Sequence, residues 1–151
     1  MGRVWVYIIS KELYPDQLQY LLLEGKRFVE GWTAHDKQLH ASFEIFKDRI
    51  IIVKVNEEVE GASGCSIDKL SRFIKQLEER TGAELLNRML VALKANNDLQ
   101  VVHASRIPDL LEEAFLNEDS IVYSTSASTT TELSNWEQPL KHTWLKKYLK
   151  N

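Results

Sequence analysis

The residues whose types and spacing suit chemistry are concentrated in one glycine- and serine-rich segment, Gly61-Ala62-Ser63-Gly64-Cys65-Ser66, directly before an amphipathic helical pattern. Glycine lets a backbone approach a ligand closely, and the first N–H groups of a helix have no intrahelical acceptor, so they bind anions. The segment therefore predicts a ligand site that uses Ser63, Gly64 and Ser66. The alternative is an ordinary strand-to-helix turn in which Ser66 is the N-cap.

The one cysteine of the chain, Cys65, lies in the same segment. The positive end of a helix dipole lowers a thiol pKa, and a nucleophilic thiolate needs a nearby base, for which His35 and His40 are the upstream candidates. These residues predict a thiol-dependent enzyme in which Cys65 and His35 are catalytic and the helix start binds an oxyanion. The alternative, which we expect, is a small buried cysteine under the helix start, because free cysteine is among the most buried residue types.

A second group of polar residues, His40, Ser42 and Glu44, alternates with apolar residues and so shares one face of a predicted strand. We expect helices to cover the opposite face of the sheet, which leaves these three as candidate ligand-binding residues on the uncovered face. The other residues expected there are Trp5, Tyr7 and Lys54. Such a mixed polar and aromatic surface suits a ligand groove, an interface between two copies of the chain, or a surface that the C-terminal residues cover.

Composition and spacing argue against several classes of function. The chain has 19 basic and 22 acidic residues and a net charge of −3, which argues against a nucleic-acid partner. No apolar run approaches the roughly 18 residues that a membrane span needs, and nothing marks a targeting segment. We therefore expect no membrane insertion and a cytoplasmic protein. The acidic residues around the glycine-rich segment lack metal-ligand spacing, so neither a metal site nor a cofactor is predicted.

The predicted elements follow the order β-α-β-β-α-β, with a further strand after them. The periodicities predict strands at 4–9, 39–46, 49–56, 89–93 and 99–103, and helices that end near Gly31 and Gly82. This order is that of a ferredoxin-like α+β fold with an antiparallel sheet. We expect a single domain, 1–151, with a core of about 1–104. The remaining residues, about 105–151, are predicted to form a C-terminal helical extension that includes a short helix capped by Ser105 and a last helix after Pro139.

Three segments carry a resemblance to a known family: Trp32 to His35, Leu39 to Ile45, and Gly61 to Lys69. They resemble a family of short bacterial proteins that are often labelled "ABC transporter ATPase", and the likeness runs nearly end to end, including Trp136 to Leu140. The label implies ATP hydrolysis. The chain contains no Walker A Gly-x-x-x-x-Gly-Lys-Ser/Thr and no Leu-Ser-Gly-Gly-Gln signature, so its residues do not carry that chemistry.

Three functions follow from these patterns. The first is a binding or interaction module, with a homodimer as one form, whose small-molecule or protein partner contacts the Gly61–Ser66 loop and the His35–Glu44 segment. The second is the thiol-dependent enzyme that uses Cys65 with a histidine base. The third is the ATPase that the family label implies.

Overall fold

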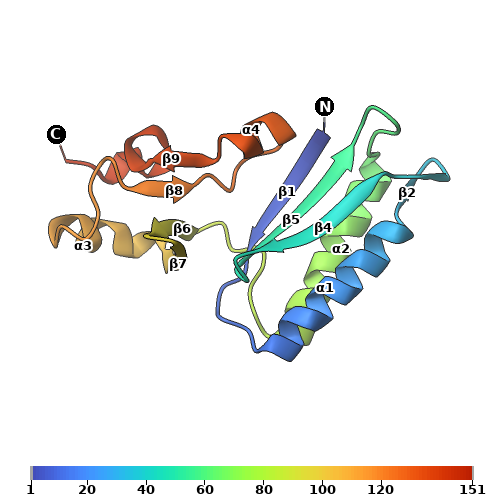
Figure 1. Cartoon of the computed structure of the whole chain (residues 1–151), viewed down its shortest axis with the longest axis horizontal. Coiled ribbons are helices and arrows are strands. Elements are labelled where there is room, and N and C mark those ends of the chain that lie inside the picture. The colour runs from blue at the N-terminus through green and yellow to red at the C-terminus, as the bar shows by residue number, and fades with distance from the viewer. Residues whose placement is uncertain (1, 151) are drawn as a thin grey trace.

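The computed structural model describes residues 2–150 and contains both helices and antiparallel sheets, which confirms the α+β class (Figure 1). The helices are α1 (Pro15–Glu30), α2 (Gly64–Thr81), α3 (Ile107–Glu112) and α4 (Thr130–Ser134), and the strands are β1 (Gly2–Ile8), β2 (Thr33–Ala34), β3 (Lys37–Gln38), β4 (Ala41–Phe46), β5 (Ile50–Asn56), β6 (Leu90–Ala95), β7 (Asp98–His103), β8 (Ile121–Tyr123) and β9 (Glu137–Pro139). Within these residues no helix is long and apolar enough to cross a membrane.

The first half of the chain forms a three-stranded antiparallel sheet in the order β1-β5-β4. Its central strand, β5, is rich in β-branched residues and is buried on both faces. The strands predicted at 39–46 and 49–56 are confirmed as β4 and β5, which form an antiparallel hairpin. Its two turn residues, Lys47 and Asp48, both have positive φ, as a type I′ turn requires.

Helices α1 and α2 cover one face of this sheet (Figure 1). Both predicted helix ends are confirmed: α1 stops at Gly31, and α2 stops at Gly82, which has the positive φ that favours glycine. The two helices run antiparallel. At one end, the side chain of Gln17 at the start of α1 donates to the carbonyl of Thr81 at the end of α2 at 3.4 Å, and at the other end Trp32, just after α1, contacts Ser66 in the first turn of α2. The main core lies between this helix pair and the sheet.

The four-stranded ferredoxin-like sheet is not confirmed, because β6 does not join β1 and β5. It instead begins a second antiparallel sheet in the order β7-β6-β8-β9. The free edge of β1 is taken by later residues: the N–H of Val4 donates to the carbonyl of Ser128 at 3.0 Å, and Arg3 forms a β-bridge with Thr129. The predicted boundary near residue 104 therefore falls inside one sheet.

The C-terminal residues differ from the helical extension that was predicted. Two of the strands of the second sheet, β8 and β9, belong to them. The last predicted helix consists of two short 3₁₀ turns, Leu140–His142 and Trp144–Tyr148. His103, not Ser105, caps the turn that leads into α3, since its Nδ1 accepts from the N–H of Ser105 at 3.1 Å.

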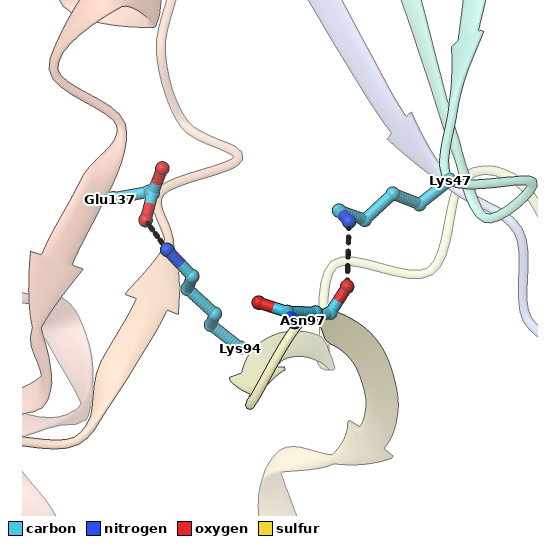
Figure 2. Close-up of polar contacts among 4 residues, drawn as sticks. All are labelled: Lys47, Lys94, Asn97 and Glu137. Carbon is cyan, nitrogen blue, oxygen red and sulfur yellow. Dashed lines mark hydrogen bonds and ion pairs between the residues drawn. The ribbon is translucent and has the colours of Figure 1, made fainter.

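The two sheets meet through an aromatic cluster beyond the helix-free face of the first sheet. Phe46, in the last position of β4, packs edge-on against Tyr123 and Trp136, with ring centroids 5.4 and 5.0 Å apart. Beside it, the ammonium of Lys47 donates to the carbonyl of Asn97 at 2.9 Å (Figure 2). The C-terminal half of the chain therefore covers one end of the helix-free face of the first sheet. It leaves the opposite end of that face accessible for a candidate site.

Candidate ligand-binding groove

The serines of the glycine-rich loop hold the start of α2 in a reciprocal capping box. Ser63 is the N-cap, and its hydroxyl accepts from the N–H of Ser66 at 3.2 Å. The hydroxyl of Ser66 accepts from the N–H of Ser63 and donates to the carbonyl of Ser63, both at 2.7 Å. Ser66 is thus the third helical residue and not the N-cap, and both hydroxyls are engaged within the turn.

The expectation that Cys65 is buried was wrong, because the side chain is exposed. Helical phase explains the difference. Ser66, Leu70 and Ile74 recur at four-residue intervals on the buried face of α2, and Cys65 lies about 100° away from Ser66 around the helix. The exposed thiol therefore lies on the solvent side of the first turn.

His35, the predicted base, lies in the turn of a short hairpin between β2 and β3 that the sequence patterns did not reveal. It is exposed and has a positive φ of 53°, and Asp36 beside it has a φ of 63°. In the part of the chain that the structure describes, no hydrogen bond joins Cys65 to a histidine, and no three His, Cys, Asp or Glu side chains gather as metal ligands.

The polar residues of β4 do share one face of the first sheet, as predicted. Ser42 pairs with Lys54, and Glu44 pairs with Ile52, so their side chains lie on the face away from α1 and α2. The carboxylate of Glu44 lies 3.1 Å from the ammonium of Lys54.

Trp5 and Tyr7 were predicted on this face, and that placement was wrong. They pair with Val53 and Ile51, and all four side chains pack in the core under the helices. Because side chains alternate between the two faces along β1, Val4 and not Trp5 lies on the face of Lys54. Burial raises the pKa of Tyr7 above its ordinary value of 10.0.

The end of the face that the C-terminal half leaves uncovered is hollowed into an open groove of about 480 Å³. The polar residues that line it are His40, Ser42, Lys54, Asn56, Glu58 and Thr130. The groove thus contains an ammonium, an imidazole, an amide, a carboxylate and two hydroxyls. Its volume is within the range of small-molecule sites.

Three of the polar lining residues, Asn56, Glu58 and Thr130, were not anticipated as site residues. Asn56 was detectable, because it lies two residues after Lys54 and so shares its face. Thr130 comes from the serine- and threonine-rich stretch near the C-terminus, and no local pattern connects it with β4. Its hydroxyl accepts from the N–H of Gly2 at 3.3 Å, which fixes the first turn of α4 beside β1.

The residues before α4 are held by a small hydrogen-bond network that positions Thr130. The hydroxyl of Thr129 accepts from the N–H of Glu132 at 3.1 Å as the N-cap of α4. The carboxylate of Glu132 accepts from the hydroxyl and the N–H of Ser128 at 3.0 and 3.2 Å, and these bonds lower the pKa of Glu132. This wall of the groove is therefore formed before any ligand arrives.

Comparison with known proteins gives a similarity to a yeast protein. Over 132 residues, 87% of this chain, the sequence is 23% identical to mRNA-decapping enzyme subunit 2 of Saccharomyces cerevisiae (strain YJM789). The matched part spans 12% of the length of that yeast protein. No protein-family model and no solved structure matches the chain.

Proposed function

We propose that the protein is a cytoplasmic, non-enzymatic binding module that holds a small organic anion in the groove between β4, β5 and α4. The observation that carries this proposal is the convergence of hydrogen-bond donors from three separate elements: Ser42, Lys54 and Thr130. A small-molecule site typically combines a concave surface with a few such polar groups. The groove includes His40 and Ser42 of the predicted ligand residues, whereas Glu44 and residues 61–66 do not line it.

The charge of the expected ligand follows from Lys54. Its ion pair with Glu44 is solvent-exposed, with 37% and 51% of the two side chains accessible. Exposed pairs contribute little to stability, so the ammonium can exchange this partner for an anionic group at low cost. Asn56 supplies an amide donor in the same groove, and Glu58 limits how much negative charge a ligand can carry there.

A thermal-unfolding panel tests the proposal. It contains carboxylates, amino acids, phosphate monoesters, Mg-ATP and a capped oligoribonucleotide. A ligand at a hundred times its Kd stabilises the native state by about 2.7 kcal/mol. We expect a carboxylate or phosphate monoester to raise the Tm of the native chain, and Lys54→Met to remove that shift. Lys146→Met, an exposed lysine on the last 3₁₀ turn, is the matched control and retains the shift.

The oligoribonucleotide and Mg-ATP in this panel test two other ligands. The name of the similar yeast protein refers to mRNA, whereas the balanced charge of this chain led us to predict no nucleic-acid partner. A Tm shift with the capped oligoribonucleotide alone would replace the small anion by RNA. Hydrolysis of Mg-ATP would instead support the ATPase that the family label implies.

A thiol-dependent enzyme is the second candidate, and the exposure of Cys65 in the first turn of α2 favours it. A thiol reagent titrated against pH tests this function. A reaction that proceeds at pH values well below the pKa of an ordinary cysteine thiol, about 8.5, would support this function. A reaction that follows the ordinary cysteine pKa would remove it.

Self-association is a further prediction from the sequence. Strand β4 is an edge strand of the first sheet and pairs on one side with β5. An edge strand can pair with a second copy of the chain. Light scattering at several protein concentrations tests whether the binding module is a homodimer, and a constant monomer mass would exclude it.

A further inference from the structure

A second groove lies on the opposite side of the molecule, between α1 and α2. It has a volume of about 370 Å³ and is lined by Phe28, Lys69, Arg72, Phe73 and Gln76. Four of these residues come from α2, and Phe28 comes from α1. The groove is separate from the one proposed above, which lies on the helix-free face of the sheet.

The apolar part of this groove is a pair of stacked aromatic rings. Phe28 and Phe73 are nearly parallel, with an interplanar angle of 6° and centroids 4.4 Å apart. Both side chains are half-buried, so part of each ring reaches the solvent. The pair continues inward to Trp32 and Phe43, which fixes the orientation of the rings.

The rim of the groove is cationic. Lys69 and Arg72 are exposed, and within residues 2–150 neither forms an ion pair. On α1, the carboxylate of Glu24 lies 3.3 Å from the guanidinium of Arg27. Two cations that form no ion pair within residues 2–150 therefore lie on α2, beside the accessible aromatic pair.

We propose that this groove docks an acidic peptide segment of a partner protein, with one aromatic or large apolar side chain against Phe28 and Phe73. A groove between two helices recognises a peptide through an apolar anchor, and charge complementarity adds specificity and speeds association. The carboxylates that flank the anchor face Lys69 and Arg72. Gln76 offers an amide for the peptide backbone. This site is independent of the small-anion site near Lys54.

The experiment uses a synthetic peptide with one central tryptophan flanked on both sides by glutamates. Binding to the native chain is measured by fluorescence anisotropy at low and physiological salt. We expect saturable binding that weakens with salt, and an affinity at least about tenfold lower for the Lys69→Glu/Arg72→Glu variant. The control is Lys26→Glu/Lys75→Glu, which makes the same change of charge at exposed positions of α1 and α2 outside the groove and retains the affinity.

Cys65 supplies a site-specific reporter for this experiment. It is the one cysteine of the chain, it is exposed, and it lies one helical turn before Lys69. A trifluoromethyl label on Cys65 is expected to change its fluorine NMR signal on addition of the peptide, and not on addition of the ligand that the Lys54 groove binds. Both double variants are exposed-surface changes, and their Tm values establish that they fold.

Several results would overturn the proposal. One is the absence of saturable binding, and another is an equal loss of affinity in the two double variants, which would indicate general charge attraction. Equal binding by a peptide with alanine in place of tryptophan would remove the role of the aromatic pair. Tighter binding of an oligoribonucleotide of equal charge that depends on Lys69 and Arg72 would assign the groove to RNA instead.

Discussion

The indole Nε1–H of Trp32 donates a hydrogen bond to the backbone carbonyl of Ser66 at 2.9 Å, and both residues are buried. This bond joins Trp32, two residues after the end of α1, to the first turn of α2. It therefore fixes the glycine-rich loop to the same core that supports the first sheet. We expect Trp32→Phe to lower the free energy of unfolding by about 1–3 kcal/mol, because it removes the donor and leaves a cavity.

The matched control for this prediction is Trp144→Phe, since 46% of that side chain is exposed. It should change the free energy of unfolding by less than about 1 kcal/mol. Urea unfolding of the two variants measures the difference. Equal effects would show that the bond between Trp32 and Ser66 does not stabilise the loop.

Gly25 and Gly64 are expected to respond differently to alanine. A Cβ at Gly25 would collide with the ring of Phe43, so Gly25→Ala should destabilise the protein by about 1–3 kcal/mol or more. A Cβ at Gly64 meets no atom within 4 Å, and alanine is the better helix former, so Gly64→Ala should be neutral or stabilising by up to about 1 kcal/mol. The Tm of each variant decides this. A destabilised Gly64→Ala would indicate a different loop geometry.

Ser63→Ala tests whether the loop serines cap the helix or bind a ligand. Loss of the N-cap should lower the free energy of unfolding by about 0.5–2 kcal/mol. The stabilisation that a ligand adds should stay the same, because the hydroxyl of Ser63 is engaged within the turn. Ser71→Ala, on the exposed face of α2, is the control and should not destabilise the protein. If Ser63→Ala lost the stabilisation that the ligand adds, the ligand site would instead be the loop of residues 61–66.

We expect the buried side chain of Tyr7 to make the free energy of unfolding fall at alkaline pH. Burial raises the pKa of Tyr7 in the folded protein above the ordinary value of 10.0. Above pH 10 the unfolded chain therefore releases a proton that the folded chain keeps, so stability is complete below that pH and falls as pH rises. The slope is up to about 1.4 kcal/mol per pH unit for this group.

Tyr7→Phe should flatten the alkaline part of the stability curve, as measured by urea unfolding between pH 9 and about 11. Tyr14→Phe is the control, because 75% of that side chain is exposed. The pKa of Tyr123 is also raised, by burial and then by Glu137, so a smaller slope should persist in Tyr7→Phe. An unchanged slope in Tyr7→Phe would contradict the effect of burial on this group.

Local patterns predicted the elements of the first half well. Pro15 and Gly31 mark the ends of α1, and Gly82 marks the end of α2, because each residue type has a conformational preference that acts locally. The alternation in 41–46 likewise placed Ser42 and Glu44 on one face. The hairpin around His35 is missing from the prediction, since neither of its turn residues, His35 and Asp36, is a glycine or asparagine.

The pairing of the second sheet and the shape of the groove depend on contacts between distant residues. β6 pairs with β8 across an intervening stretch that includes α3, and residues 128–129 take the edge of β1 that the ferredoxin-like order leaves for β6. The hydrophobic periodicity of the sequence does not indicate which distant strands pair with one another. The position of Thr130 in the groove was missed for the same reason, since it lies beside Gly2, which is 128 positions earlier in the chain.

We have proposed that the groove between β4, β5 and α4 holds the ligand. An amide NMR titration with the compound that gives the largest Tm shift tests it most directly. We expect saturable shifts at Ser42, Lys54 and Asn56, all lost together in Lys54→Met and all kept in Lys146→Met. Shifts confined to residues 61–66, with Lys54 unaffected, would contradict it.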